Sequence, residues 1–342
     1  MRVLTIPAFA KVNLQLHIVG RRADGYHELR TVFQTISLHD RLTLTLLGPQ
    51  QAAPLRSSEG IALECTDPSL PAGRENLVWR ALDALRRELK LKARIHARLD
   101  KWIPAARGLG GGSSDAAAAL VGLLRLARST GPKSGGPART MPWSRLLELA
   151  ASLGADVPFF LLGGRGLGVG RGDEIYPLDD TAPQTVLVVS PAAIAVPTPE
   201  AFGWVSARMG WGKHGSRAVG WIQSGGKPPH SKGLTNAAAA RKLLRFCALC
   251  WSSQGGPLSN DFEPAVFARH PRLRNIKREL LRGGATDAAL AGSGSAVFGV
   301  FPNPVQARRT AQKFPNDQVF LAETVSRTRY RKAVGLSGGT GL

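Results

Sequence analysis

The sequence predicts an α+β fold, in which strands and helices are mixed along the chain. Three observations support it: apolar and polar residues alternate near the N-terminus, residues 116–126 are rich in Ala and Leu, and residues 288–301 follow a strand, glycine-turn, strand pattern. Alternation with a period of two is typical of half-buried strands, whereas Ala and Leu favour helices. Because hairpin-like strands come first, α+β is favoured over a doubly wound parallel sheet.

The first half of the chain is expected to open with strands. Residues 8–20 alternate strictly, which predicts a half-buried strand with a polar face made of Lys11, Asn13, Gln15 and His17. A turn at residues 21–25 leads to strands at residues 29–38 and 41–47. Further elements are a helix over residues 76–89 with Asn76 as N-cap, a strand over 93–99, and helices over 116–126, over 146–153 and after Asp156.

The second half follows a glycine-dense stretch at residues 163–172. Its expected elements are a strand at 185–190, a helical stretch at 260–281, the two strands within 288–301, a helix at 304–313 and a strand at 319–324. We therefore expect two domains, residues 1–180 and 181–327, followed by a flexible basic tail at residues 328–342.

Composition narrows the class of protein. The chain has 342 residues, 43% of them hydrophobic, which is enough for two well-buried domains. No apolar run reaches the ~18 residues of a membrane span, and residues 1–20 lack a signal-peptide pattern. We therefore expect a cytoplasmic protein without a membrane partner. Cys247 and Cys250 form a C-x-x-C within a helical pattern, and without a second ligand pair we interpret them as small buried residues rather than a redox or zinc pair.

The formal net charge of +21 is spread over the chain. Much of it falls in two basic insertions, residues 129–143 and 208–232, and in the tail. Their Gly, Pro and Ser content is typical of loops. A solvated basic surface on a protein with anionic ligands is therefore favoured over a specific nucleic-acid partner.

The most informative segment is Pro104-Ala-Ala-Arg-Gly-Leu-Gly-Gly-Gly-Ser-Ser-Asp-Ala116. A glycine-rich turn at a helix N-terminus presents unpaired backbone N–H groups beside the positive end of the helix dipole, which suits phosphate. The segment lacks the Lys-Ser/Thr pair of a Walker A motif and the glycine spacing of the dinucleotide fingerprint. It predicts an anion site, with a tight structural turn as the alternative.

Three other segments offer groups for phosphoryl transfer. Lys11 and Asn13 share a strand face, Asp156 stands at a helix start, and Gly292-Ser-Gly294 forms a second glycine turn. Phosphoryl transfer depends on positioning, charge neutralisation and a base for the acceptor hydroxyl. Each segment alone has a structural explanation, as a solvated lysine, a helix cap or an ordinary turn. Their combination favours a kinase.

In this order the segments resemble the GHMP kinase superfamily, whose three signatures match residues 11–16 with their flanks, 104–119 and 290–301. The sequence is closest to its 4-diphosphocytidyl-2-C-methyl-D-erythritol kinase family, a resemblance that runs from Ala8 to about Phe301. The segments that carry it are Pro7-Ala-Phe-Ala-Lys-Val-Asn-Leu-Gln-Leu16, Asp24-Gly-Tyr-His27, Gly108-Leu-Gly-Gly-Gly-Ser-Ser-Asp-Ala116, Gly154-Ala-Asp-Val-Pro-Phe-Phe160, Val196-Pro-Thr-Pro199 and Asn260-Asp-Phe-Glu263.

This resemblance implies a two-domain GHMP kinase fold, with a ribosomal protein S5 domain 2-like N-terminal domain and a ferredoxin-like C-terminal domain. It implies a kinase of the non-mevalonate (MEP) isoprenoid pathway that uses ATP and Mg²⁺. The acceptor would be the 2-hydroxyl of 4-diphosphocytidyl-2-C-methyl-D-erythritol.

The resemblance also implies roles for single residues. Asp156 would be the general base, with Lys11 close to it and Asn13 at the same end of the acceptor. Tyr26 and His27 would stack on the cytosine and hydrogen-bond its edge, Phe202 would cover its other face, and Thr198 would contact the cytidine. The predicted ATP contacts are Asn76, Pro104, Gly108, Leu109, Gly110, Gly111, Gly112, Ser113 and Ser114. No residue is named as a metal ligand.

One departure and two alternatives stay open. Arg107 stands where the family usually has a small residue, so the approach of the loop to the nucleotide is expected to differ. A GHMP kinase for a homoserine- or mevalonate-like alcohol would not need Tyr26, His27 and Phe202 around a base. A basic nucleic-acid-binding protein on a kinase fold would instead bind DNA or RNA with a steep salt dependence.

Overall fold

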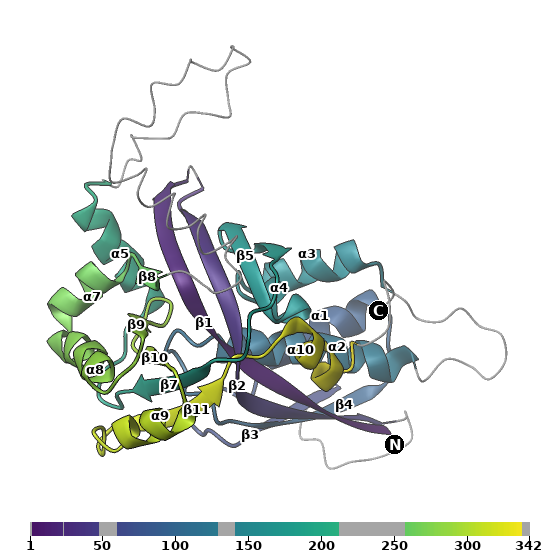
Figure 1. Ribbon diagram of the computed structural model, residues 1–342. Coiled ribbons are helices and arrows are strands. Elements are labelled where there is room, and N and C mark those ends of the chain that lie inside the picture. Colours follow the sequence, from purple (N-terminus) through teal and green to yellow (C-terminus); the bar gives the residue numbers. More distant parts are fainter. Residues whose placement is uncertain (1, 23, 48–59, 129–140, 212–256, 337–342) are drawn as a thin grey trace.

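The structure is a computed structural model and describes residues 2–22, 24–47, 60–128, 141–211 and 257–336 (Figure 1). The predicted helix with Cys247 and Cys250, and most of the two basic insertions, lie outside the described residues. Two sheets flanked by helices make up two domains, which confirms the α+β prediction. None of the helices described is both long and apolar enough to cross a membrane.

The sheet of the first domain is built around a long antiparallel pair. β1 (Arg2–Arg21) pairs with β2 (His27–Leu47) along nearly its full length. The two strands predicted at 29–38 and 41–47 are therefore one strand, and its pairing with β1 continues past a register shift between Phe9 and Lys11. The rest of the sheet is formed by β3 (Ile61–Cys65), β4 (Arg94–Asp100), β5 (Arg165–Gly170), β6 (Glu174–Pro177) and β8 (Ser259–Asn260), in the order β3-β4-β2-β1-β8 with β5 and β6 beyond β2.

Four helices of the first domain follow the predicted pattern. Asn76 caps α1 (Leu77–Glu88), since its Oδ1 accepts the Val78 N–H at 2.9 Å. The Ala- and Leu-rich α2 (Gly111–Arg128) is buried along most of its length and packs on β1 and β2. The other two are α3 (Trp143–Leu153) and α4 (Val157–Leu162).

The second domain is a four-stranded antiparallel sheet with the order β11-β7-β10-β9. Its strands are β7 (Thr185–Ser190), β9 (Asp287–Leu290), β10 (Val297–Phe301) and β11 (Gln318–Glu323), and its helices are α5 (Thr198–Arg208), α7 (Glu263–Arg269), α8 (Pro271–Arg282) and α9 (Pro304–Ala311). This is the predicted ferredoxin-like arrangement. The helical stretch predicted at 260–281 is two helices, because His270 precedes a proline and has non-helical angles (φ −125°, ψ 75°).

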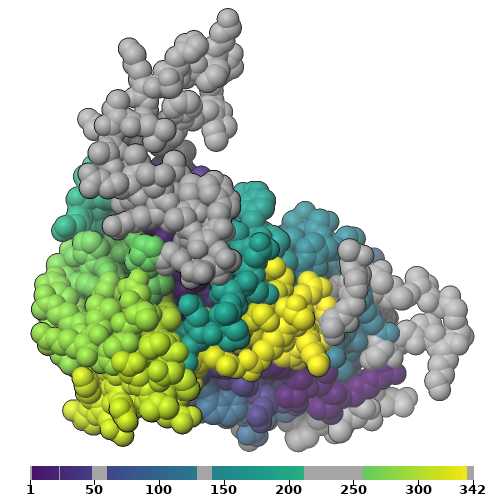
Figure 2. Space-filling model, viewed as in Figure 1, coloured from purple at the N-terminus to yellow at the C-terminus, as the bar shows by residue number. Residues whose placement is uncertain are grey.

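The beginning of the C-terminal tail is ordered, so the expectation of a flexible tail is wrong for residues 328–336. α10 (Arg327–Val334) packs on the first domain, and Figure 2 shows these yellow residues among the teal and blue ones. Tyr330 and Val334, one helical turn apart, are buried, and the Tyr330 hydroxyl donates to the Phe160 carbonyl. Residues 337–342 lie outside the described part. Because β8 and α10 also belong to it, the first domain includes segments from beyond residue 180.

An apolar layer joins the two domains. It contains side chains of β1 and β2 packed with side chains of the second sheet, among them Val12, Leu14, Val32, Ile36, Val186, Val188, Ala289 and Phe298. In Figure 1, β1 and β2 run between the two groups of helices. The strands β1 and β2 are therefore held in a packed junction between the domains.

Candidate active site

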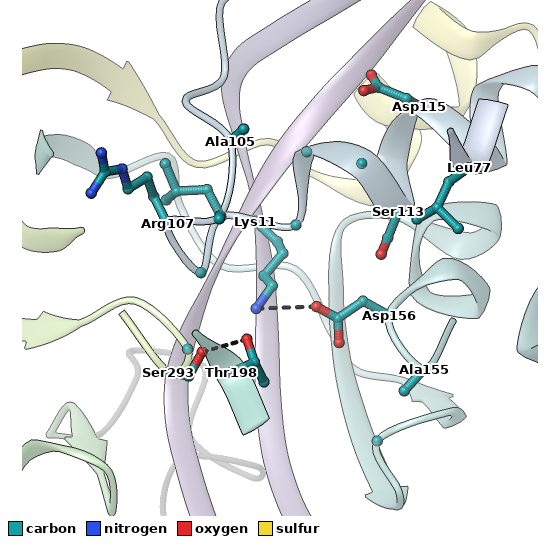
Figure 3. A pocket seen from close by; sticks show the side chains of 18 of the residues that line it. Lys11, Leu77, Ala105, Arg107, Ser113, Asp115, Ala155, Asp156, Thr198 and Ser293 are labelled. Carbon is teal, nitrogen blue, oxygen red and sulfur yellow. Dashed lines mark hydrogen bonds and ion pairs between the residues drawn. The ribbon is translucent and has the colours of Figure 1, made fainter. Parts of the chain in front are cut away.

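A cleft of about 560 Å³ lies at the domain junction, between β1, the glycine loop, the start of α4 and the second glycine turn (Figure 3). It continues into a hollow of about 1050 Å³ that Tyr26 and His27 line. Five residues line both the cleft and the hollow: Leu29, Ala155, Arg171, Thr198 and Phe202. The shared residues show that the two spaces adjoin each other.

Lys11 and Asp156 face each other in this cleft (Figure 3). The Lys11 Nζ lies 3.3 Å from Asp156 Oδ2 and donates a hydrogen bond to Asn13 Oδ1 at 2.7 Å. Asn13 Nδ2 in turn donates to Thr31 Oγ1 at 2.7 Å. The Lys11 side chain is 5% exposed and that of Asp156 is 32% exposed. A buried, fixed ammonium thus stands beside a carboxylate that a ligand can reach.

The glycine loop is shaped by contacts that leave no room for side chains. Gly108 and Gly110 have φ of +78° and +72°, which favours glycine. A Cβ on Gly108 would lie 1.9 Å from the Ala291 carbonyl oxygen. The first hydrogen bond of α2 runs from the Ser114 N–H to the Gly110 carbonyl at 2.9 Å, so the amides of residues 111–113 precede the helical hydrogen bonds. These amides lie at the helix end where the sequence predicts an anion, and anion binding there stays a prediction.

Asn260 holds the second glycine turn against this loop. Its Nδ2 donates to the Leu290 and Gly292 carbonyls, each at 2.7 Å, and its Oδ1 accepts the Phe262 N–H at 2.9 Å. Both N–H groups and the carbonyl oxygen of the buried amide are thereby hydrogen-bonded. Ser293 of the turn is hydrogen-bonded to Thr198, the first residue of α5, with 2.9 Å between the hydroxyl oxygens.

An aromatic cluster lines the adjoining hollow. His27 stacks on Phe202 with ring centroids 4.5 Å apart and an interplanar angle of 19°, and its Nε2 lies 2.8 Å from Ser206 Oγ. Burial and the nearby Arg21 lower the pKa of His27, which favours a neutral ring. Tyr26 stands at the rim, 57% exposed. The three aromatic residues predicted to hold a base thus lie together, while their contacts with cytosine stay a prediction.

Most of the predicted site residues line the cleft, from five separate segments of the chain. These are Lys11, Asn13, Asn76, Pro104, Gly108, Leu109, Gly110, Gly111, Gly112, Ser113, Asp156, Thr198 and Phe202. Ser114 does not line it: the residue is 1% exposed, and its hydroxyl has no hydrogen-bond partner among the described residues. Adjacent residues on a helix point about 100° apart, so only one of the two serines faces the cleft.

A buried charged cluster beneath the loop was not predicted. Lys101 Nζ donates to Asp115 Oδ2 at 2.8 Å and also to Asp40, whose other oxygen accepts the Ile103 N–H at 2.8 Å. Burial raises the pKa of Asp115, and Lys101 only partly offsets this. Burial lowers the pKa of Lys101, but the two carboxylates outweigh it and the pKa is raised. No sequence motif points to this cluster, because the pairing of β2 with β4 creates it.

Arg107 connects the loop to the second domain. Its Nη1 donates to Ser295 Oγ at 2.8 Å and its Nη2 to the Ala192 carbonyl at 3.1 Å, while its own carbonyl accepts the Ala296 N–H at 3.2 Å. Burial lowers the pKa of Arg107. The departure from the usual small residue therefore adds side-chain contacts between the domains and leaves the glycines that follow in place.

The described residues contain no group of three or more His, Cys, Asp or Glu side chains that would hold a metal ion. Mg²⁺ in phosphoryl-transfer sites is commonly bound by phosphates, water and only one or two protein oxygens. The Ser113 hydroxyl and the Asp156 carboxylate both line the cleft (Figure 3). This donor set fits a magnesium ion that arrives with a nucleotide.

Comparison with known proteins agrees with this geometry. Residues 76–164 match the GHMP kinases N terminal domain and residues 237–319 the GHMP kinases C terminal family. The 4-diphosphocytidyl-2-C-methyl-D-erythritol kinase of Solibacter usitatus (strain Ellin6076) is 39% identical over 95% of this chain and 89% of its own length. The kinase of the same name from Moorella thermoacetica (strain ATCC 39073 / JCM 9320) is 36% identical over 96% of this chain and 100% of its own length.

A solved structure is also similar. A crystal structure of 4-(cytidine 5'-diphospho)-2C-methyl-D-erythritol kinase superposes with a TM-score of 0.66 at 30% identity and covers 94% of this chain and 99% of its own. The curated relatives are similar along nearly the whole chain and carry one name. The chain therefore belongs to the 4-diphosphocytidyl-2-C-methyl-D-erythritol kinase family of the GHMP kinases.

Proposed function

We propose that this protein transfers the γ-phosphate of ATP to the 2-hydroxyl of 4-diphosphocytidyl-2-C-methyl-D-erythritol in the cytoplasm. The observation that carries the proposal is the Lys11–Asp156 pair, 3.3 Å apart, in a cleft that has the glycine loop on one side and continues into an aromatic hollow. The names of the relatives supply the identity of the acceptor.

Asp156 serves as the general base in this proposal. Its carboxylate accepts the proton of the acceptor hydroxyl as the hydroxyl oxygen bonds to the γ-phosphorus, and the bond from that phosphorus to the β,γ-bridging oxygen breaks to release ADP. Lys11 stabilises the negative charge of the transferring phosphoryl group from the buried side of the cleft. Asn13, fixed by Lys11 and Thr31, orients the alcohol.

ATP is expected to bind with its phosphates at the N-terminus of α2. The amides of residues 111–113 precede the first hydrogen bond of α2 and would donate to the phosphates, and the positive φ of Gly108 and Gly110 would let the backbone approach them closely. Mg²⁺ would be held by the phosphates and by the Ser113 hydroxyl, and it supplies charge neutralisation. Asn76 and Pro104 line the same cleft and would contact the rest of the nucleotide.

The aromatic hollow favours a nucleotide-linked acceptor over a small alcohol. Homoserine- or mevalonate-like acceptors would fill only the space around Asp156. A hollow of about 1050 Å³ with His27, Phe202 and Tyr26 in its wall offers stacking surfaces for a planar base. Stacking of this kind contributes about 1–3 kcal/mol per base.

The test is the release of ADP by the purified protein with ATP and Mg²⁺, with and without the cytidine-diphosphate-linked acceptor. We expect release that depends on the acceptor and that homoserine or mevalonate does not support. Release with one of these small alcohols would instead favour the other GHMP kinases. Retention on DNA that falls steeply with salt, with no ATP turnover, would favour the nucleic-acid-binding alternative.

A further inference from the structure

The two ends of the proposed acceptor lie in different parts of the cleft. The hydroxyl end belongs beside Asp156, and the base belongs in the aromatic hollow with His27. The diphosphate that joins them must pass where the two spaces meet. Only one of the five residues that line both spaces carries a charge, and it is Arg171.

Arg171 is held in place by its neighbours. It follows β5 in a turn closed by a hydrogen bond from the Gly172 N–H to the Val169 carbonyl at 2.9 Å. Its Nε donates to Asp173 Oδ2 at 3.0 Å, its Nη2 donates to the same oxygen, and its Cζ lies 5.1 Å from the centroid of the Tyr26 ring. The side chain is 34% exposed. The guanidinium is thus oriented before any ligand binds.

One nitrogen of this guanidinium remains available. Within the described part of the chain, Nη1 makes no hydrogen bond, whereas Nε and Nη2 are both used by Asp173. Lys11, which faces Asp156, is 5% exposed and already bonded to Asn13. A guanidinium N–H forms strong, charge-assisted hydrogen bonds to phosphate oxygens.

We propose that Arg171 binds the diphosphate of the acceptor, and so selects nucleoside-diphosphate-linked alcohols over uncharged alcohols and over the free nucleoside. The inference rests on the proposed function, because that function places the two ends of the acceptor. In this proposal the Nη1 of Arg171 donates a hydrogen bond to the diphosphate that joins the two ends of the acceptor.

The test compares ligands that differ only in phosphate. Binding of CDP and of cytidine is measured by calorimetry for the wild type, Arg171→Gln and Arg171→Lys, with Arg98→Gln as the matched control. Arg98 is a surface arginine of β4 that pairs with Asp100 and does not line the cleft. We expect Arg171→Gln to weaken CDP binding about tenfold and to leave cytidine binding unchanged, with partial recovery in Arg171→Lys. The control should match the wild type.

The same variants are then assayed for turnover. The acceptor KM of Arg171→Gln should rise about tenfold while the ATP KM changes less than about twofold. Equal weakening of CDP and cytidine would overturn the proposal, since Arg171 would then act through Tyr26 on the base. A wild type that binds CDP no better than cytidine would also overturn it. Absence of acceptor-dependent turnover would count against the proposed function, whereas the binding comparison would still decide the role of Arg171.

Discussion

At the scale of single residues, the proposed function divides the tasks between Lys11 and Asp156. Lys11 is buried and fixed by two hydrogen-bonding or ionic partners, whereas Asp156 is a third exposed to the cleft. A fixed ammonium stabilises charge without moving, and an accessible carboxylate accepts a proton from a ligand. The two residues therefore differ in what their replacement should change.

Replacement of Asp156 by Asn keeps the size of the side chain and removes its capacity to accept a proton. We expect kcat to fall at least about 100-fold, because a general base contributes about 10²–10⁴ in rate. The Kd of a non-hydrolysable ATP analogue should change less than about threefold, since in the proposed function ATP binds at the glycine loop and not at Asp156. Asp317→Asn serves as the control, because Asp317 pairs with Arg272 in the second domain. Near-normal kcat in Asp156→Asn would show that the base is another group.

The sequence was informative about residues that project from regular elements. Strand alternation put Lys11 and Asn13 on one face, and the structure joins them by a hydrogen bond of 2.7 Å. It was uninformative about Lys101, because its partners Asp40 and Asp115 come from a neighbouring strand and a helix. Pairing between distant segments sets such clusters, and no local pattern encodes them.

At the scale of elements, the two glycine turns fit together through their backbones. Gly108 approaches Ala291 so closely that a methyl group has no space, and its φ of +78° disfavours any other residue. Packing between the domains therefore requires glycine here, whether or not a nucleotide is bound. This gives the loop a structural role that can be separated from catalysis.

Gly108→Ala should therefore destabilise the fold by about 2 kcal/mol or more, from the left-handed backbone and from the clash with the Ala291 carbonyl. Thermal or urea unfolding measures this loss. Gly203→Ala is the matched control, since Gly203 lies within α5 and an added Cβ meets nothing within 4 Å. That change should stabilise by about 0.5–1 kcal/mol through helix propensity. Equal stability of Gly108→Ala and the wild type would contradict the tight contact between the turns.

Elements with strong periodicity were predicted well, and the errors have physical causes. α1 and its cap at Asn76 were predicted because the cap and the apolar spacing agree. α10 was missed because basic residues dominate its composition, while its burial depends on Tyr330 and Val334 alone. The break between α7 and α8 could have been predicted from Pro271, which disfavours a helical conformation at the residue before it.

At the scale of the whole molecule, the glycine loop belongs to the first domain, whereas the part of the cleft wall formed by Thr198 and Phe202 belongs to the second. The Arg107 side chain contacts Ser295, whose hydroxyl donates to the Ile194 carbonyl at 2.5 Å. Ser293 of the same turn contacts Thr198 at the start of α5, and α5 carries Phe202. A continuous set of contacts thus leads from the glycine loop to the aromatic hollow. If these contacts set the distance between γ-phosphate and hydroxyl, their loss should lower kcat more than it raises either KM.

We expect Arg107→Ala to reduce kcat about tenfold, because a small misplacement of the reacting groups slows the reaction strongly. The KM values for ATP and for the acceptor should stay within about twofold of those of the wild type. Ser295→Ala removes the same side-chain contact, so the double variant should be no slower than the slower single variant. Arg107→Lys should recover part of kcat, since an ammonium reaches one of the two acceptors. Steady-state kinetics of the four proteins in the cycle measures the coupling, with unfolding midpoints as a check on the fold. If the effects of the two substitutions on kcat were strictly multiplicative, Arg107 and Ser295 would act independently. The connection between the domains would then depend on the hydrogen bond from the Ala296 N–H to the Arg107 carbonyl and on the apolar layer.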